Sequence, residues 1–344
     1  MLSAVDLYER RTRRNVEHAR RWLNRAIKDF ALFKKLVPFD KRTNKAVKCS
    51  DPALAIYLLQ QSVEKAVKAA AIASGQYKPR DFIRYFKHNS LALIIDLNTK
   101  IVSQIQAIGL GPIATMMGVD LVDGKSKLAA LKNQIEGAAP LLDKNGKKVD
   151  FRTQSRRITP ETVDQILNMV IQHRRLLLDV IRTTFNILPT MGIRKGYGVI
   201  DDPQEFLRQL SDSISVNLKV HPPSEEQWKV PLEFIRRMSD LGFAPVDELN
   251  RRKTITNHLG AWAFSHALLW LSYLTFAHEE TTRYPLRQKG NIQAGRIGCD
   301  DYDNALGIVD SIGRVGYITS LTLDDMKTEI DSLASFFAVD LKGR

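Results

Sequence analysis

Cysteine is scarce in this chain of 344 residues, where only Cys49 and Cys299 occur, far apart in the sequence. Two distant cysteines make neither the disulfide framework of a small secreted domain nor the paired spacing of a zinc cluster. The N-terminal stretch is charged and lacks the apolar run of a secretory signal. We therefore expect a protein of the reducing cytoplasm that holds no structural metal.

The sequence also lacks the glycine patterns that cradle phosphates. The glycine-rich stretch MGIRKGYGVIDDP has neither the GxxxxGK[ST] order nor the GxGxxG order. In those motifs, glycines at fixed spacing let backbone N–H groups approach a phosphate. We expect no cofactor on this basis.

Strand-like alternation and a clean membrane span are missing as well. The most apolar run, His258–Ala277, is nearly long enough to cross a bilayer. However, two serines and two histidines interrupt it, and a histidine and two glutamates follow at once. Polar residues are costly inside a membrane, so we expect a buried helix of a bundle and no membrane partner.

Helical periodicity dominates what remains. Ala53–Gly75 carries a wide apolar stripe, with Ser50 or Asp51 as its cap and Gly75 at its end, which predicts a core helix. No segment alternates as a strand does, so the predicted fold class is all-α, an up-and-down helical bundle. The other expected helices include Val5–Leu36, the stretch after Asn89 or Ser90, Ser126–Gly137, a long helix capped by Thr159, Pro203–Ser213, Tyr302–Val315 and Thr322–Val339.

The charge balance favours a polyanionic partner. Lys plus Arg total 51 against 38 Asp plus Glu, a net charge of +13. Such an excess attracts nucleic acid through its phosphates, although most charge runs are merely solvated surfaces. In the arginine-rich first helix the candidate phosphate contacts are Arg10, Arg13 and Arg14.

Further candidates lie on and after the core helix. Lys65 and Lys68 need partners if they are buried, because an unpaired buried charge is costly, and Glu64 and Arg283 are the candidate partners. The connector Gln76–Lys87 is basic and aromatic. His88 follows it at a helix start, where a cap or core polar role is the simpler interpretation. Together with the arginines above, the expected RNA- or nucleotide-binding residues are Lys65, Lys68, Arg84, His88 and Arg283.

Four sequence elements occur in a family-specific order: Gln60–Ile72 (QQSVEKAVKAAAI), His88–Ile94 (HNSLALI), Thr281–Pro285 (TTRYP) and Asp301–Ile312 (DYDNALGIVDSI). With them the chain resembles the HEPN domain family (higher eukaryotes and prokaryotes nucleotide-binding). Members of that family carry a QQxxEKxxKA helix, a histidine at the next helix start and a later TRYP segment. The matching residues are Gln61, Glu64, Lys65, Lys68, His88, Arg283, Tyr284 and Pro285.

The resemblance implies a helical bundle, commonly a homodimer, that often works beside a small nucleotidyltransferase or in RNA-targeting defence and toxin systems. It covers about half of the chain, since the distance from His88 to Thr281 exceeds what a compact HEPN bundle needs. We therefore expect residues 1–108 and 251–344 to form the HEPN-like bundle. Residues 109–250 are then a helical insertion or second layer.

HEPN ribonucleases carry an Arg-x(4–6)-His pair, in which the imidazole moves protons at the ribose 2′-hydroxyl and the guanidinium stabilises phosphorane charge. Arg252 and His258, in RKTITNH, have this spacing. In an arginine-rich chain such spacing also arises by chance, and Arg13 with His18 satisfies it too. Three hypotheses follow: a non-catalytic RNA- or nucleotide-binding partner of an enzyme, a metal-independent endoribonuclease using Arg252 and His258, or a helical scaffold.

Overall fold

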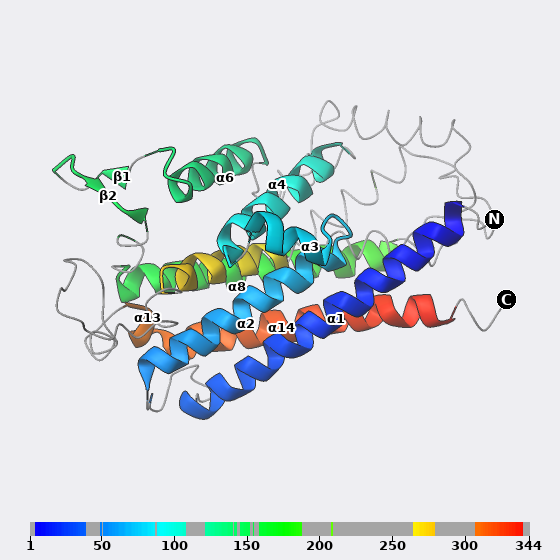
Figure 1. Ribbon diagram of the computed structural model, residues 1–344, viewed down its shortest axis with the longest axis horizontal. Helices are drawn as coiled ribbons and strands as arrows, with labels where there is room; N and C mark the ends of the chain where they lie inside the picture. The colour runs from blue at the N-terminus through cyan, green and yellow to red at the C-terminus, as the bar shows by residue number, and fades with distance from the viewer. Residues whose placement is uncertain are drawn as a thin grey trace. The chain divides into compact units, whose positions relative to one another are not determined.

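The computed structural model describes residues 4–38, 49, 51–86, 88–107, 121–139, 141–142, 145–151, 154, 158–187, 208, 264–278 and 307–339. Nearly all of this part of the chain is helical, which confirms the all-α expectation (Figure 1). The helices are α1 (Ala4–Leu36), α2 (Pro52–Ala73), α3 (Pro79–Asp81), the π-helix η1 (Phe82–Phe86), α4 (Ser90–Ala107), α6 (Leu121–Ile135), α8 (Pro160–Ile187), a helix over residues 264–276, α13 (Gly307–Asp310) and α14 (Ile312–Val339).

The chain divides into two compact units. One consists of Met1–Leu97, Ala130–Ile171 and Phe264–Arg344, and the other of Asn98–Ala129 and Gln172–Ala263. Both ends of the chain thus belong to the first unit. Compactness alone does not say which segments form a HEPN-like core, so the division at residues 108 and 250 stays a prediction.

In the first unit, α1 packs against α2 and α14, and Figure 1 shows it running antiparallel to both. The buried stripe of α1 includes Leu23, Phe30 and Phe33, and that of α2 includes Ile56 and Leu59. These apolar residues recur at three- and four-residue intervals, which places them on one face of each helix. Burial of the two stripes against each other is what holds this pair together.

The ends of α2 confirm the predicted signals. The Asp51 carboxylate accepts a hydrogen bond from the Leu54 N–H at 2.9 Å, and Pro52 occupies the first turn, where no donor is needed. Gly75 has a φ of +73°, the left-handed conformation that closes a helix C-terminus. At the next helix start, Asn89 accepts from the Ala92 N–H at 2.8 Å, so Asn89 rather than Ser90 is the cap of α4.

A small strand pair accompanies the described helices: β1 (Leu141–Leu142) and β2 (Lys148–Val149) are antiparallel to each other. Gly146, with a φ of +74°, provides the left-handed backbone that such a tight connection favours. Strands of two residues are too short to show alternation, so the sequence pattern could not reveal them.

One prediction about the C-terminal helices is wrong. Residues 322–339 do not start a new helix, because α14 runs without a break from Ile312 to Val339. Thr322 is buried and donates its hydroxyl hydrogen bond to the Ile318 carbonyl at 2.8 Å, and Thr319 does the same to Val315. A threonine satisfied by the preceding turn lies inside a helix instead of capping one.

Polar contacts tie α14 to the first half of α8. The Arg314 guanidinium lies 2.6 Å from the Asp164 carboxylate and donates to the Asn168 side chain at 2.9 Å. Ten of the thirteen residues of the 264–276 helix are buried, whereas His266 is only partly buried and accepts a hydrogen bond from Trp270 at 3.2 Å. Within the described segments, every helix is too short or too polar to span a bilayer.

Candidate nucleic-acid interface

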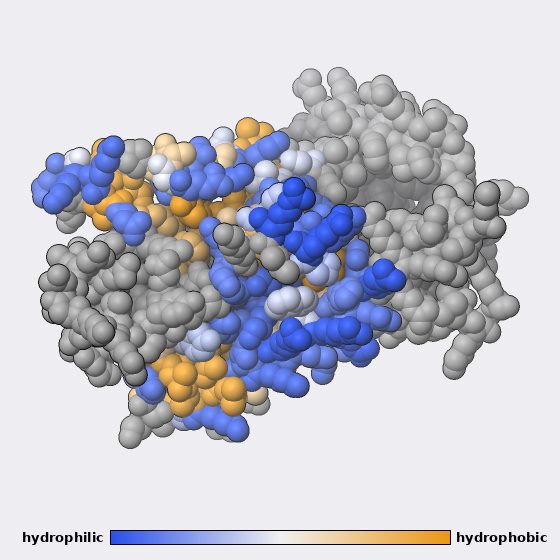
Figure 2. Space-filling model, viewed as in Figure 1, coloured by the Kyte–Doolittle hydropathy of each residue, from blue (hydrophilic) through white to orange (hydrophobic). Residues whose placement is uncertain are grey.

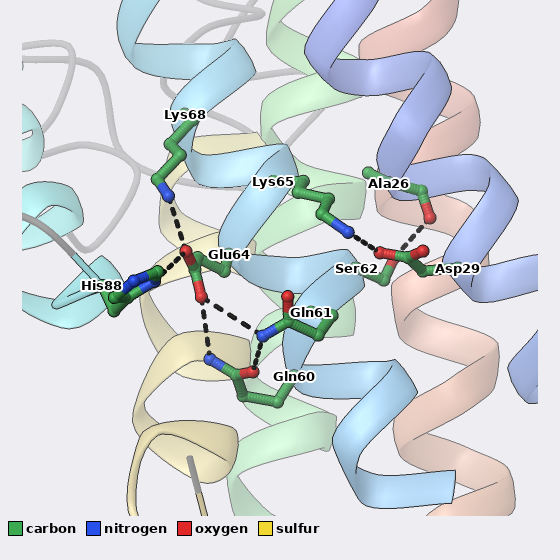
Figure 3. A network of polar contacts seen from close by, with 9 residues as sticks. All are labelled: Ala26, Asp29, Gln60, Gln61, Ser62, Glu64, Lys65, Lys68 and His88. Atoms are coloured by element: carbon green, nitrogen blue, oxygen red, sulfur yellow. Dashed lines mark hydrogen bonds and ion pairs between the residues drawn. The ribbon is translucent and has the colours of Figure 1, made fainter. Parts of the chain in front are cut away.

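The motif residues of α2 converge on one buried carboxylate, that of Glu64 (Figure 3). The Lys68 ammonium lies 2.5 Å from Glu64 Oε1, and His88 Nδ1 lies 3.2 Å from the same oxygen. Gln60 donates to Glu64 Oε2 at 3.2 Å, while Gln61 donates to the Gln60 side-chain oxygen at 2.7 Å. Four of the five polar residues of the QQxxEKxxK pattern, all except Lys65, thus form one polar network on the otherwise apolar helix α2.

Opposing effects set the protonation of Glu64. Burial by itself raises the pKa of the Glu64 carboxyl, but the Lys68 charge and hydrogen bonds from Lys68, His88 and Gln60 outweigh it, so the pKa lies below its usual value. Glu64 is therefore ionised at neutral pH. The charge of Lys68, which is only 7% exposed, is balanced inside the bundle.

Lys65 has a partner that the sequence did not suggest. Its ammonium forms an ion pair with Asp29 of α1, and both side chains are about four-fifths buried. One turn away, the Ser62 hydroxyl donates to the Ala26 carbonyl at 2.9 Å. These contacts lock α2 onto α1, which makes Lys65 a structural cation. Arg283, the other predicted partner, lies outside the described residues.

Trp22 connects this network to the surface of α1. Lys68 Nζ lies 5.1 Å from the centroid of the indole ring, and Arg25 Cζ lies 5.6 Å from it. Phe82 contacts the same ring edge-on, with centroids 6.4 Å apart. Trp22 therefore brings the cations of α1 next to η1. Trp22 is not among the site residues predicted from the sequence, although an Arg three residues after a Trp on one helix is the signal for such a pair.

The segment from Lys78 to His88 is held by several contacts. The Lys78 N–H donates to the Asp81 carboxylate at 2.7 Å, which caps the N-terminus of the short helix α3. Tyr77 donates its hydroxyl to Asp96 of α4, and its ring meets Phe86 edge-on at 5.9 Å. Burial and the neighbouring Asp96 carboxylate raise the pKa of Tyr77, so the phenol stays protonated as the donor.

His88 is not the core or cap residue that its position suggested. Its side chain is 58% exposed, and Asn89 supplies the cap. Because one ring nitrogen faces the buried Glu64 carboxylate, the network orients an imidazole at the protein surface. The structure therefore shows an exposed imidazole with one nitrogen engaged by Glu64.

The remaining predicted residues are placed as follows. Arg14 and Arg84 are exposed, on α1 and η1 respectively. Arg10 and Arg13 lie in α1, but their side chains are outside the described residues. The predicted catalytic pair, Arg252 and His258, also lies outside them. In the part of the chain that the structure describes, no three His, Cys, Asp or Glu side chains are grouped to hold a metal.

No protein-family model, no curated protein and no solved structure matches this chain.

Proposed function

We propose that this chain is a HEPN-like protein that binds RNA or nucleotides and acts with a partner enzyme, of nucleotidyltransferase type, in a defence, toxin–antitoxin or RNA-processing context. Two kinds of support exist: the four motif elements of the sequence, and the way the described motif residues gather around Glu64. The partner and the biological context depend on the resemblance alone.

The observation that carries the binding function is a basic face on the first unit. It consists of exposed cations of α1 and of the segment before α4, namely Arg21, Arg25, Lys28, Lys78, Arg80 and Arg84. Figure 2 shows hydrophilic side chains along α1 and over α3 and η1 in one view. The contact of Trp22 with Phe82 joins these two stretches.

Acidic side chains neutralise only part of this face. The charge of Asp29 is balanced by Lys65, whereas Asp81, whose partner is a backbone N–H, and the exposed Glu17 of α1 keep their charges, so six cations face two carboxylates. The basic face therefore presents an excess of positive charge, which is what phosphates recognise. Neither Lys65 nor Lys68 contributes to that excess, because Asp29 and Glu64 balance them.

Fluorescence anisotropy with labelled single-stranded and hairpin RNAs, in the presence of a chelator, tests this function. Affinity should fall steeply as salt rises, because each neutralised phosphate releases counterions. Arg25→Glu should weaken binding at least tenfold. Lys35→Glu is the matched control, since Lys35 is exposed on the same helix, about 15 Å along the axis from Arg25, and the charge change is equal.

Two results would count against the proposal. Absence of binding to RNA and to nucleotides at low salt would favour the scaffold hypothesis. Equal weakening by Arg25→Glu and Lys35→Glu would mean that net charge, and not the basic face, attracts the RNA.

A further inference from the structure

Tyr85 is an aromatic residue that the fold leaves at the surface. It is 63% exposed, whereas Phe82 and Tyr77, in the same segment, are 3% and 4% exposed. Phe82 and Phe86 are four residues apart and contact Trp22 and Tyr77, respectively. Since the neighbouring rings anchor the segment, Tyr85 is not needed to hold it in place.

The backbone under Tyr85 is defined by contacts on both sides. Before it, the Lys78 N–H bonds to Asp81, and after it, the Asn89 N–H donates to the Phe86 carbonyl at 2.7 Å. Residues Phe82–Phe86 form a π-helix, a conformation that often occurs at functional sites. An exposed ring on an anchored backbone pays little entropy when a flat ligand stacks on it.

A cation already stacks on this ring. Arg84 Cζ lies 5.2 Å from the centroid of Tyr85, and Arg84 is itself exposed. Because Tyr85 stays 63% exposed, Arg84 covers only part of it. The Tyr85 ring can stack on a flat π system of a ligand, and the Arg84 guanidinium can pair with a negative charge beside that π system. An unpaired nucleobase with its phosphate has both features.

We propose that Tyr85 and Arg84 form a stacking site for an unpaired base of single-stranded RNA, with the base on the Tyr85 ring and Arg84 at the adjoining phosphate. This inference rests on the proposed function and specifies it, because it assigns the basic face to single strands over duplexes. In a duplex the bases are stacked on one another, and none is available to the ring.

Three purified full-length variants test the site: Tyr85→Ala, Tyr85→Phe and, as the control, Leu54→Ala. Leu54 is also an exposed apolar residue of the first unit, 43% exposed, on α2. Binding is measured for a 12-nucleotide single-stranded RNA, a DNA of the same sequence and a blunt RNA duplex. Tyr85→Ala should weaken single-strand binding about tenfold and duplex binding less than twofold. Tyr85→Phe, which keeps the ring, and Leu54→Ala should stay within twofold of the unmodified chain.

The outcomes separate this inference from the function on which it rests. If Tyr85→Ala loses affinity for both the single-stranded RNA and the single-stranded DNA, the ring contacts the base. If it loses affinity for the RNA alone, the site also recognises the ribose. Either result supports the site. If Tyr85→Ala binds single strands as well as the unmodified chain does, the site is refuted and the basic face survives. Equal losses on single strands and duplex would also refute it. If the unmodified chain binds nothing at low salt, both proposals fail.

Discussion

Removing the charge of Glu64 should leave the buried Lys68 ammonium without the counter-charge that Glu64 supplies. In Glu64→Leu the apolar side chain fills the space of the carboxylate, but Lys68, which is 7% exposed, keeps a charge with no counter-charge from Glu64. Losing one partner of a buried ion pair costs about 3–5 kcal/mol of unfolding free energy. His88 and Gln60 also lose their acceptor, which adds to the cost.

The decisive comparison is with Glu64→Leu/Lys68→Met, in which both charges are gone. Replacement of a buried pair by apolar residues is often neutral, so the double variant should regain most of the stability lost by the single one. Urea unfolding followed by circular dichroism gives the free energies, and hydrogen exchange at α2 amides shows whether the change is local to the first unit. Equal destabilisation of both variants would refute the charge argument and leave packing as the cause.

An exposed pair of the same spacing serves as the control for this experiment. Lys127 and Asp123 of α6 are also four residues apart, with 76% and 49% of their side chains exposed. Because solvent screens such a pair, Asp123→Asn should cost no more than about 0.5 kcal/mol. If Asp123→Asn lowers the unfolding free energy nearly as much as Glu64→Leu does, the measured loss does not depend on the burial of the ion pair.

Three further predictions follow from the structure and the sequence. The pKa of Glu64 is lower in the folded chain than its ordinary value near 4.5, so its stabilising effect is complete above that value and is lost as the pH falls below it. The difference in unfolding free energy between the unmodified chain and Glu64→Gln should therefore be constant above about pH 4.5 and narrow below it, and a difference that stays constant at lower pH would contradict this. Gly75→Ala should cost about 1 kcal/mol in urea unfolding through backbone strain alone, since an added Cβ meets nothing within 4 Å, and Gly75→Asn should cost less; equal costs would argue against a left-handed cap. If Arg252 and His258 form a nuclease pair, chelator-resistant RNA cleavage should disappear in His258→Ala, whereas unchanged cleavage would remove that residue from consideration.

Local signals predicted the helices because helix geometry fixes the distances between near neighbours. Asp51, Pro52 and Gly75 act within one turn of the ends of α2, so their roles follow from the sequence. The same holds for Glu64 and Lys68, since residues four apart meet on any helix. The predicted break before residue 322 failed because an acidic pair after a threonine resembles a helix start, and only burial showed that Thr322 bonds to the preceding turn.

Contacts between distant residues needed the tertiary structure. Asp29 and Lys65 are 36 positions apart, and Glu64 and His88 are 24 apart, so no spacing rule relates them. The sequence also did not show which ring of this aromatic segment is exposed: Tyr85 lies at the surface, whereas Phe82 and Phe86 contact Trp22 and Tyr77.

The sequence by itself determined the helical class, the boundaries of α2 and the internal pairing of its polar residues, because these depend on contacts within a few positions of the chain. The tertiary structure decided which cations are neutralised and which remain at the surface. That choice depends on the register in which α1, α2 and η1 pack, and the register is set by the burial of apolar faces rather than by the charged residues themselves. In the sequence Lys65 resembles Arg25 and Arg84, and only the packing of α2 against α1 shows that Lys65 is neutralised by Asp29 while the two arginines stay exposed.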